Sequence, residues 1–192
     1  SGPGCPVCVT PAGYIDRAAE LTRQAGHVVC TFGDMLRVPG NHGNLLEAKA
    51  SGGDVRMMVS PMDVLAWAAA EPDQTFVVAT VGFETTLPAY ALLLERLAAQ
   101  GVDNVRLLTS LKAILPAMQW ICESEPEIDG FLGPGHVSTI LGSDVYVPLC
   151  ARYRKPVAVG GFTYGQILAA LCDLIEQLRD GRAETHNLYP DK

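Results

Sequence analysis

The sequence has no long run of Lys and Arg, no long apolar run and no dense set of cysteines. It has 192 residues, with 14 Lys or Arg against 21 Asp or Glu, and a formal net charge of -7. A nucleic-acid surface needs a concentrated basic patch, so this class of partner is excluded. No apolar run approaches the ~20 residues of a membrane-spanning helix, and no signal-peptide pattern opens the chain. We therefore expect a cytoplasmic protein without a membrane partner.

The six cysteines are too scattered for a disulfide framework. Only Cys5 and Cys8 are close in sequence, and no second Cys-x-x-Cys exists to complete a closed zinc site. A disulfide-rich secreted domain would be shorter and denser in cysteine, so we expect a reducing compartment. We expect the other four thiols to be buried as small hydrophobic side chains: Cys30, Cys122, Cys150 and Cys172.

Short apolar stretches alternate with amphipathic ones along the whole chain. The apolar stretches, typical of parallel strands buried on both faces, are residues 28–32, 55–60, 76–82, 105–109, 130–132 and 156–160. The stretches with helical spacing are residues 12–25, 86–100, 111–123 and 165–179. This alternation predicts an α/β fold with right-handed crossovers. In such folds, functional residues gather in loops beyond the carboxyl ends of the strands.

A short internal sequence repeat indicates two related units. Gly-Pro-Gly-Cys at residues 2–5 is matched by Gly-Pro-Gly-His at residues 133–136, and Phe32 and Phe162 follow a strand at almost the same offset. We interpret this as two related three-layer α/β units with mainly parallel sheets that face each other across a cleft. The expected units are residues 1–83, incomplete at the N-terminus, and residues 84–192. Gly-Pro-Gly is also a common turn, so chance is the alternative.

The loop Gly-Pro-Gly-Cys-Pro-Val-Cys is the strongest chemical signal in the sequence. Two intervening residues let the sulfurs of Cys5 and Cys8 face each other at the start of a helix. There the helix N–H groups and dipole stabilise a thiolate, which is the nucleophilic, metal-binding and redox-competent form. The pattern favours redox or open metal chemistry, with a structural pair of thiols as the alternative.

Three further Gly-bearing loops follow expected strands and carry polar side chains. Asp34 and Arg37 can pair with each other, or can bind an anion or a partner. Glu84 can act in proton transfer, or can simply stabilise the start of the next helix. His136 can transfer protons or contact a metal, unless it is a packed or capping histidine. We expect these loops and the thiol loop to converge on one cleft.

Four blocks of the sequence resemble the signature blocks of the HypD family, the scaffold proteins of NiFe-hydrogenase maturation. They are residues 2–8 (GPGCPVC), 31–40 (TFGDMLRVPG), 82–86 (GFETT) and 133–138 (GPGHVS). The resemblance covers the whole chain, most strongly residues 1–142, and the order and length of the blocks make it specific.

The resemblance implies a role in assembling an Fe(CN)2CO unit. An iron atom would be held with a small HypC-type partner while a HypE-type protein delivers cyanide and carbon monoxide is attached. The family's thiol pair, implicated in redox change and iron handling, matches Cys5 and Cys8, which are therefore also the expected metal ligands. The site residues that the resemblance implies are Cys5, Cys8, Asp34, Arg37, Glu84 and His136.

The sequence also departs from the family pattern. It lacks the upstream Cys-Gly-x-His motif and the cysteine-rich segment that binds a 4Fe-4S cluster, and residues 161–165 are Gly-Phe-Thr-Tyr-Gly instead of beginning Gly-Phe-Glu-Pro. Because it opens with Ser1, we expect the central portion of such a protein, not competent alone to complete the reaction. Two alternatives stay open: a general thiol–disulfide oxidoreductase acting on other proteins, and a substrate-binding α/β module with inert cysteines.

Overall fold

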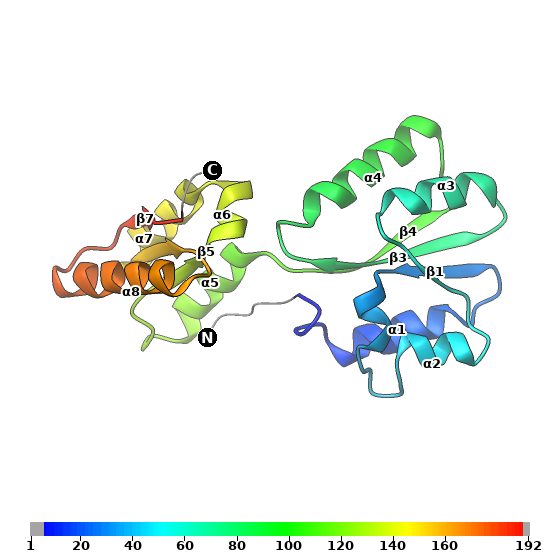
Figure 1. Cartoon of the computed structure of the whole chain (residues 1–192), viewed down its shortest axis with the longest axis horizontal. Coiled ribbons are helices and arrows are strands. Elements are labelled where there is room, and N and C mark those ends of the chain that lie inside the picture. The colour runs from blue at the N-terminus through cyan, green and yellow to red at the C-terminus, as the bar shows by residue number, and fades with distance from the viewer. Residues whose placement is uncertain (1–5, 190–192) are drawn as a thin grey trace. The chain divides into compact units, whose positions relative to one another are not determined.

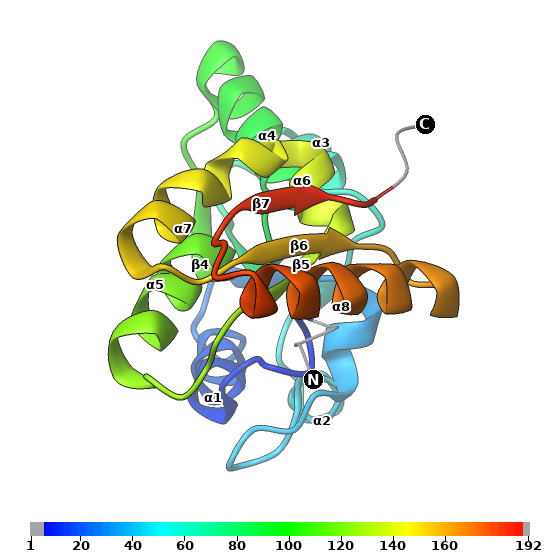
Figure 2. The same ribbon diagram turned by 90° about the vertical axis from the view of Figure 1, so that its left-hand side faces the viewer.

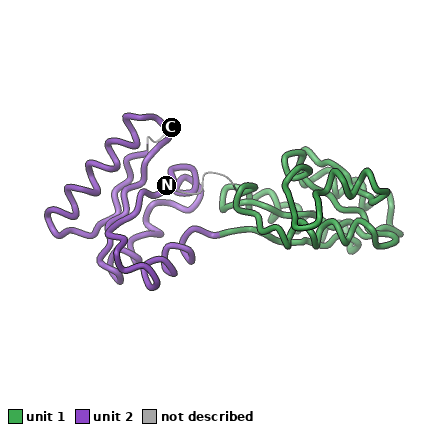
Figure 3. Tube along the Cα trace, turned by 90° about the horizontal axis from the view of Figure 1, so that it is seen from below, with its two compact units in different colours: residues 1, 3–112 green, residues 2, 113–192 purple. Residues whose placement is uncertain are grey.

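The fold consists of two compact α/β units (Figure 3). It is seen in a computed structural model that describes residues 6–189. The first unit ends at Lys112 and the second begins at Ala113. The first unit extends past the boundary expected at residue 83, because the strand that follows pairs along its whole length with the strand before it.

The first unit is built on a four-stranded sheet with strand order β2-β1-β3-β4, in which every neighbouring pair is parallel. Its elements in chain order are α1 (Ala12–Leu21), β1 (His27–Thr31), the 3-10 helix η1 (Gly33–Arg37), α2 (Leu45–Ala50), β2 (Val55–Met57), α3 (Met62–Ala70), β3 (Thr75–Gly82), α4 (Leu87–Gln100) and β4 (Val105–Leu111). The expected α/β class with parallel strands is confirmed in this unit.

Helices cover both faces of this sheet, α1 and α2 on one side and α3 and α4 on the other (Figure 1). Successive side chains of a strand point to opposite faces, so β1 contributes Val28 and Cys30 to one core cluster and Val29 to another. The same alternation places Phe76 and Val77 of β3 on opposite faces. Burial on both faces explains the continuous apolar runs in the sequence.

The second unit has a three-stranded parallel sheet in the order β5-β6-β7. Its elements are α5 (Ile114–Ser124), β5 (Phe131–Pro134), α6 (Gly135–Leu141), the 3-10 helix η2 (Ser143–Tyr146), α7 (Val147–Tyr153), β6 (Val157–Gly160), α8 (Tyr164–Arg179) and β7 (Thr185–Asn187). Figure 2 shows α8 running along this sheet. Ala158 of β6 packs against Ala170 and Leu174 of α8, whereas Val157 and Val159 pack against α5 and α7.

Several expected elements have different ends in the structure. The first helix ends at Leu21 and not at residue 25, and the Thr22 hydroxyl donates to the Ala19 carbonyl oxygen at 2.7 Å. The strand expected over residues 55–60 ends at Met57, because the Asp63 carboxylate accepts the N–H groups of Val59 and Ser60 and opens the next helix. Within residues 6–189, no helix is both long and apolar enough to cross a membrane.

Candidate functional site

The carboxyl ends of β1 and β3 form the topological switch point of the four-stranded sheet. The two strands are neighbours, and the chain leaves β1 toward β2 at one edge and β3 toward β4 at the other. In open parallel sheets, ligands bind in the crevice outside such a point. Two of the predicted loops leave the sheet there, one carrying Asp34 and Arg37 and the other carrying Glu84.

The thiol loop is described from Pro6 onward, and Cys5 lies outside the described residues. The hydroxyl of Thr10 donates to the Pro6 carbonyl oxygen at 3.0 Å, and its N–H donates to the Val7 carbonyl oxygen at 3.2 Å, which closes a turn. Cys8 is exposed on this turn. The expectation that Cys8 lies at a helix start is wrong, because α1 begins only at Ala12.

An apolar anchor holds this turn against the first unit. Val7, the residue before Cys8, packs on a buried cluster formed by Ile15, Met35 and Val81. Met35 comes from the loop after β1 and Val81 from the end of β3. The core therefore fixes the backbone of the turn while the Cys8 side chain remains accessible.

The loop after β1 is a single turn of 3-10 helix, η1, which presents Asp34 and Arg37 to solvent and buries Met35. Side chains three residues apart eclipse each other in a 3-10 helix, so Asp34 and Arg37 lie on the same side. Within the described part of the chain the two residues make no ion pair with each other. The predicted alternative in which Asp34 and Arg37 pair with each other is therefore wrong.

A pocket of about 390 Å³ brings three of the six predicted site residues together. Cys8, Asp34 and Arg37 line it. The other described residues of its wall are Val7, Thr10, Ala12, Val38 and Pro39. A thiol, a carboxylate and a guanidinium thus share a small cavity with an apolar wall. Thr10 and the apolar wall residues were not predicted, although Val38 and Pro39 belong to the same sequence block as Asp34.

Glu84 lies in the neighbouring loop, buried at 4% exposure, and is not among the described residues that line the pocket. Gly82 allows this tight connection, because a Cβ there would lie 2.6 Å from the Oγ1 of Thr86. The following helix α4 carries Tyr90, whose pKa is raised to about 12 by burial, with a smaller contribution from the charge of Asp34. The loop after β1 is therefore electrostatically coupled to the helix that follows Glu84.

His136 belongs to the second unit, where it follows β5 at the carboxyl edge of the three-stranded sheet. Its side chain is exposed, and its ring centroid lies 4.5 Å from that of Phe162 and 5.9 Å from that of Tyr189. His136 is therefore held by aromatic rings. The convergence of all the predicted loops on one cleft stays a prediction.

The remaining thiols differ in exposure. Cys30 and Cys150 are buried and Cys122 is partly buried, as expected, but Cys172 is exposed. The expectation for Cys172 is wrong because α8 packs on its sheet through Ala170 and Leu174. Burial raises the pKa of Cys30 to about 12 and also raises that of Cys122, which makes both poor nucleophiles.

The described residues contain no group of three or more His, Cys, Asp and Glu side chains arranged to hold a metal ion. The predicted metal ligands are Cys5 and Cys8, and Cys5 is not described. Iron binding by this pair therefore stays a prediction.

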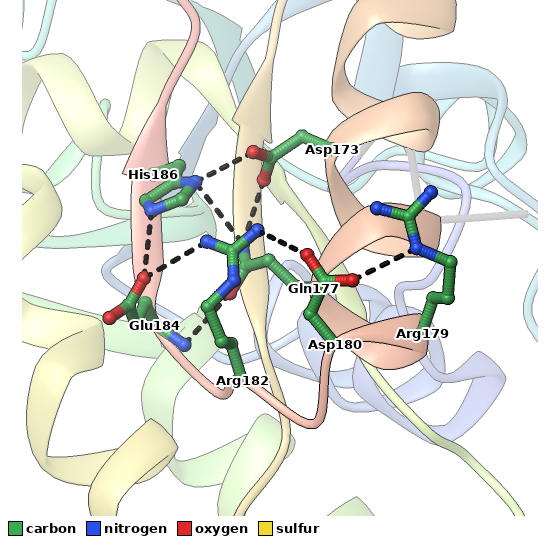
Figure 4. A network of polar contacts seen from close by, with 7 residues as sticks. All are labelled: Asp173, Gln177, Arg179, Asp180, Arg182, Glu184 and His186. Atoms are coloured by element: carbon green, nitrogen blue, oxygen red, sulfur yellow. Dashed lines mark hydrogen bonds and ion pairs between the residues drawn. The ribbon is translucent and has the colours of Figure 1, made fainter.

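A polar network in the second unit joins α8 to the edge strand β7 (Figure 4). The Nδ1 of His186 lies 2.6 Å from Asp173 Oδ1, and its Nε2 lies 3.3 Å from Glu184 Oε2. Buried Gln177 donates to Asp173 Oδ2 at 2.7 Å and accepts from the Glu184 N–H at 2.9 Å. The network continues through Arg179, Asp180 and Arg182. These side chains bind one another and fasten β7 to α8, a structural role that the sequence did not reveal.

Comparisons with known proteins agree with the sequence blocks. A family model described as "HypD: Hydrogenase formation hypA family" matches residues 1–192. The chain is similar to the "Hydrogenase maturation factor HypD" of Azotobacter vinelandii, with 43% identity over 196 residues that cover 98% of this chain and 52% of that protein. The protein of the same name from Escherichia coli is 39% identical over 189 residues, which cover 98% and 51% of the two chains. The chain thus spans about half the length of these curated relatives.

Proposed function

Because the chain belongs to the HypD family of hydrogenase formation proteins, we propose that it serves in hydrogenase maturation, as part of the scaffold on which the Fe(CN)2CO unit of NiFe-hydrogenase is assembled. The iron is the substrate of this process and is held at the Cys5–Cys8 loop together with a HypC-type partner. A HypE-type protein delivers the cyanide, and the finished unit passes to the hydrogenase large subunit. A 4Fe-4S cluster belongs to the full-length protein.

The observation that carries this proposal is the pocket shared by Cys8, Asp34 and Arg37. A thiolate is a soft ligand suited to iron, and a nearby guanidinium stabilises its negative charge. The same guanidinium can donate hydrogen bonds to a bound anion such as cyanide. A volume of about 390 Å³ falls within the range of small-ligand sites. The pocket thus combines a metal-binding group with a charged group for the anionic ligands.

The thiol pair adds a redox function to the proposed site. When two thiolates form a disulfide, two electrons leave the pair, and reduction restores both thiols. Cys5 and Cys8 can therefore alternate between an iron-binding form and an oxidised form. Glu84 and His136 complete the set of proposed functional residues, as groups that can move protons.

A general thiol–disulfide oxidoreductase is the alternative function. That chemistry commonly uses a thiol activated at the first turn of a helix. Cys8 lies on the turn before α1, and the pocket that it lines also contains Asp34 and Arg37. A thiol that lies outside the first turn of the helix and shares a pocket with charged groups favours a binding site over a generic reductase.

The experiment that tests the proposal measures bound iron and the thiol reduction potential of the anaerobic chain, with and without a HypC-type partner. We expect iron to be retained only with the partner and to be lost in Cys5→Ser and Cys8→Ser. Cys172→Ser is the matched control, because it removes an exposed thiol from the other unit and should leave iron retention unchanged. In the reduced protein, Cys8→Ser should change the free energy of unfolding by no more than about 0.5 kcal/mol, as for most exposed positions.

Two outcomes would reject the proposal. Equal iron retention by the Cys5→Ser/Cys8→Ser double variant would place the metal elsewhere. A reversible two-electron potential in a chain that holds no iron would favour the oxidoreductase. This conclusion requires that iron is still absent after the family's upstream Cys-Gly-x-His segment has been added to the chain.

A further inference from the structure

Three aromatic side chains meet at the carboxyl edge of the sheet in the second unit. His136 follows the end of β5, Phe162 follows the end of β6, and Tyr189 follows the end of β7. These strands pair in parallel, β5 with β6 and β6 with β7, so the three loops leave the sheet at the same edge. One histidine thus lies next to two rings from loops distant in the sequence.

The ring geometry is that of favourable aromatic contacts. The His136 and Phe162 rings are tilted by 42° with centroids 4.5 Å apart, and Tyr189 meets His136 edge-on at 87° and 5.9 Å. Aromatic pairs prefer such tilted and edge-to-face arrangements within about 4.5–7 Å. Within residues 6–189, no hydrogen bond holds either ring nitrogen of His136. The orientation of the imidazole therefore comes from the two rings, and its nitrogens stay available to a ligand.

The position of Phe162 is set by its backbone. The N–H groups of Phe162 and Thr163 donate to Gln166 Oε1 at 3.1 and 3.2 Å, within the capping box that opens α8. The Phe162 side chain is nevertheless 64% exposed, so core burial does not explain its place. Within residues 6–189, the aromatic ring that it contacts is that of His136.

Tyr189 is anchored in a similar way. Its N–H donates to Asn187 Oδ1 at 3.0 Å, and the N–H of Leu188 donates to the Val159 carbonyl oxygen at 2.9 Å. The ring lies directly against the turn before His136, because a Cβ on Gly135 would come within 2.3 Å of Tyr189 Cδ2. A glycine at position 135 is therefore needed for this contact.

We propose that Phe162 and Tyr189 are positioning residues of His136, which restrict its imidazole to one orientation in which the nitrogens can meet a bound partner or ligand. A side chain held in one orientation before binding loses less freedom when its partner arrives. The proposal rests on the proposed function only in taking His136 as a functional group. The ring arrangement itself can be tested separately.

The test is NMR of the full chain labelled in histidine, with the His136 ring resonances assigned by their loss in His136→Gln. In the unsubstituted chain we expect ring-current shifts of the His136 ring protons and cross-relaxation with Phe162. Phe162→Leu should abolish both signals, whereas the conservative Phe162→Tyr should keep them. Tyr189→Leu should give a smaller change, because its ring is more distant and edge-on.

Tyr164→Leu is the matched control, because Tyr164 is 96% exposed, lies close to Phe162 in sequence and is not in ring contact with His136 in the described chain. It should leave the His136 signals in place.

Unchanged His136 resonances in a folded Phe162→Leu chain would overturn the proposal, and so would equal effects of Phe162→Leu and Tyr164→Leu. Iron retention distinguishes the positioning proposal from the proposed function of His136. If Phe162→Leu loses the ring-current shifts, the positioning proposal is supported. If His136→Gln still retains iron in the presence of the partner, the proposed function of His136 is wrong.

Discussion

The two sheets present candidate site residues at the same kind of edge but fix them differently. In the first unit the loops are fixed by apolar residues, partly buried Val7 and buried Met35, while Cys8 and Arg37 line a pocket. In the second unit the proposed functional side chain itself, His136, is held by two rings. The first unit thus fixes a loop through its apolar contacts, whereas in the second unit the contacts are made by the His136 ring itself. The predictions below test this difference.

The largest expected effect separates core burial from ring contact. Phe76 is fully buried in β3, so Phe76→Ala should lower the free energy of unfolding of the first unit by about 3–5 kcal/mol. The same substitution at exposed Phe162 should cost no more than about 1.5 kcal/mol in the second unit. Each unit has one tryptophan, Trp67 in the first and Trp120 in the second. When the other tryptophan is replaced by Phe, fluorescence during urea unfolding gives the free energy of unfolding of one unit at a time. Equal losses at both positions would contradict this contrast.

The next effect concerns the buried amide that fastens β7 to α8. Gln177→Ala should lower the free energy of unfolding of the second unit by about 1–3 kcal/mol, because the Glu184 N–H loses its acceptor. Trp120 fluorescence during urea unfolding measures it. Gln119→Ala, at an exposed glutamine of α5 in the same unit, is the control for loss of an amide side chain alone. A Gln177→Ala loss no greater than that of the control would show that the network contributes little.

A smaller effect is the acid sensitivity of the first unit. Two hydrogen bonds from Arg56, at 2.6 and 2.8 Å, hold the pKa of the Glu71 carboxyl below its ordinary value of 4.5. A carboxyl whose pKa is lower when folded stabilises the protein above its unfolded pKa, and this stability is lost as the pH falls through the folded value. Unfolding of the first unit should thus become easier below about pH 4.5, and Glu71→Gln should weaken this trend. Urea titrations between pH 3 and 7 measure it, and Glu127→Gln in the other unit should leave the trend unchanged.

The smallest effect concerns the two exposed thiols of residues 6–189, Cys8 in the first unit and Cys172 in the second. In a Cys5→Ser background at pH 7, Arg37→Ala should slow alkylation of Cys8 severalfold, because a neighbouring positive charge stabilises the thiolate. Arg37→Lys should keep most of the rate. Cys172 serves as the internal reference, and peptide mapping reads both thiols from one sample. A Cys8 rate that does not respond to Arg37→Ala would mean that the two groups share a pocket without interacting.

Much of the first sheet could be predicted from its sequence. β1 and β3 are apolar on both faces because helices cover both, and this burial leaves continuous apolar runs such as Val28–Cys30 and Phe76–Ala79. β7 could not be predicted, because three residues with polar side chains carry no such run. Its place is set by pairing with β6 and by contacts to α8.

The candidate site shows a similar limit. Cys8, Asp34 and Arg37 were predicted because unusual residues on Gly-bearing loops leave a local signal. The contact between His136, Phe162 and Tyr189 was not, because it depends on three strands ending at one edge. The residue pattern within a single segment cannot predict a contact between side chains from three separate loops.

The packing of Val7 has a mechanical consequence for the thiol loop. The valine between the two cysteines packs on Ile15, Met35 and Val81. Lifting the loop away from the unit requires this valine to leave its apolar contacts. Any outward movement of this turn must therefore disturb the packing on Met35, which follows β1, and on Val81, at the end of β3.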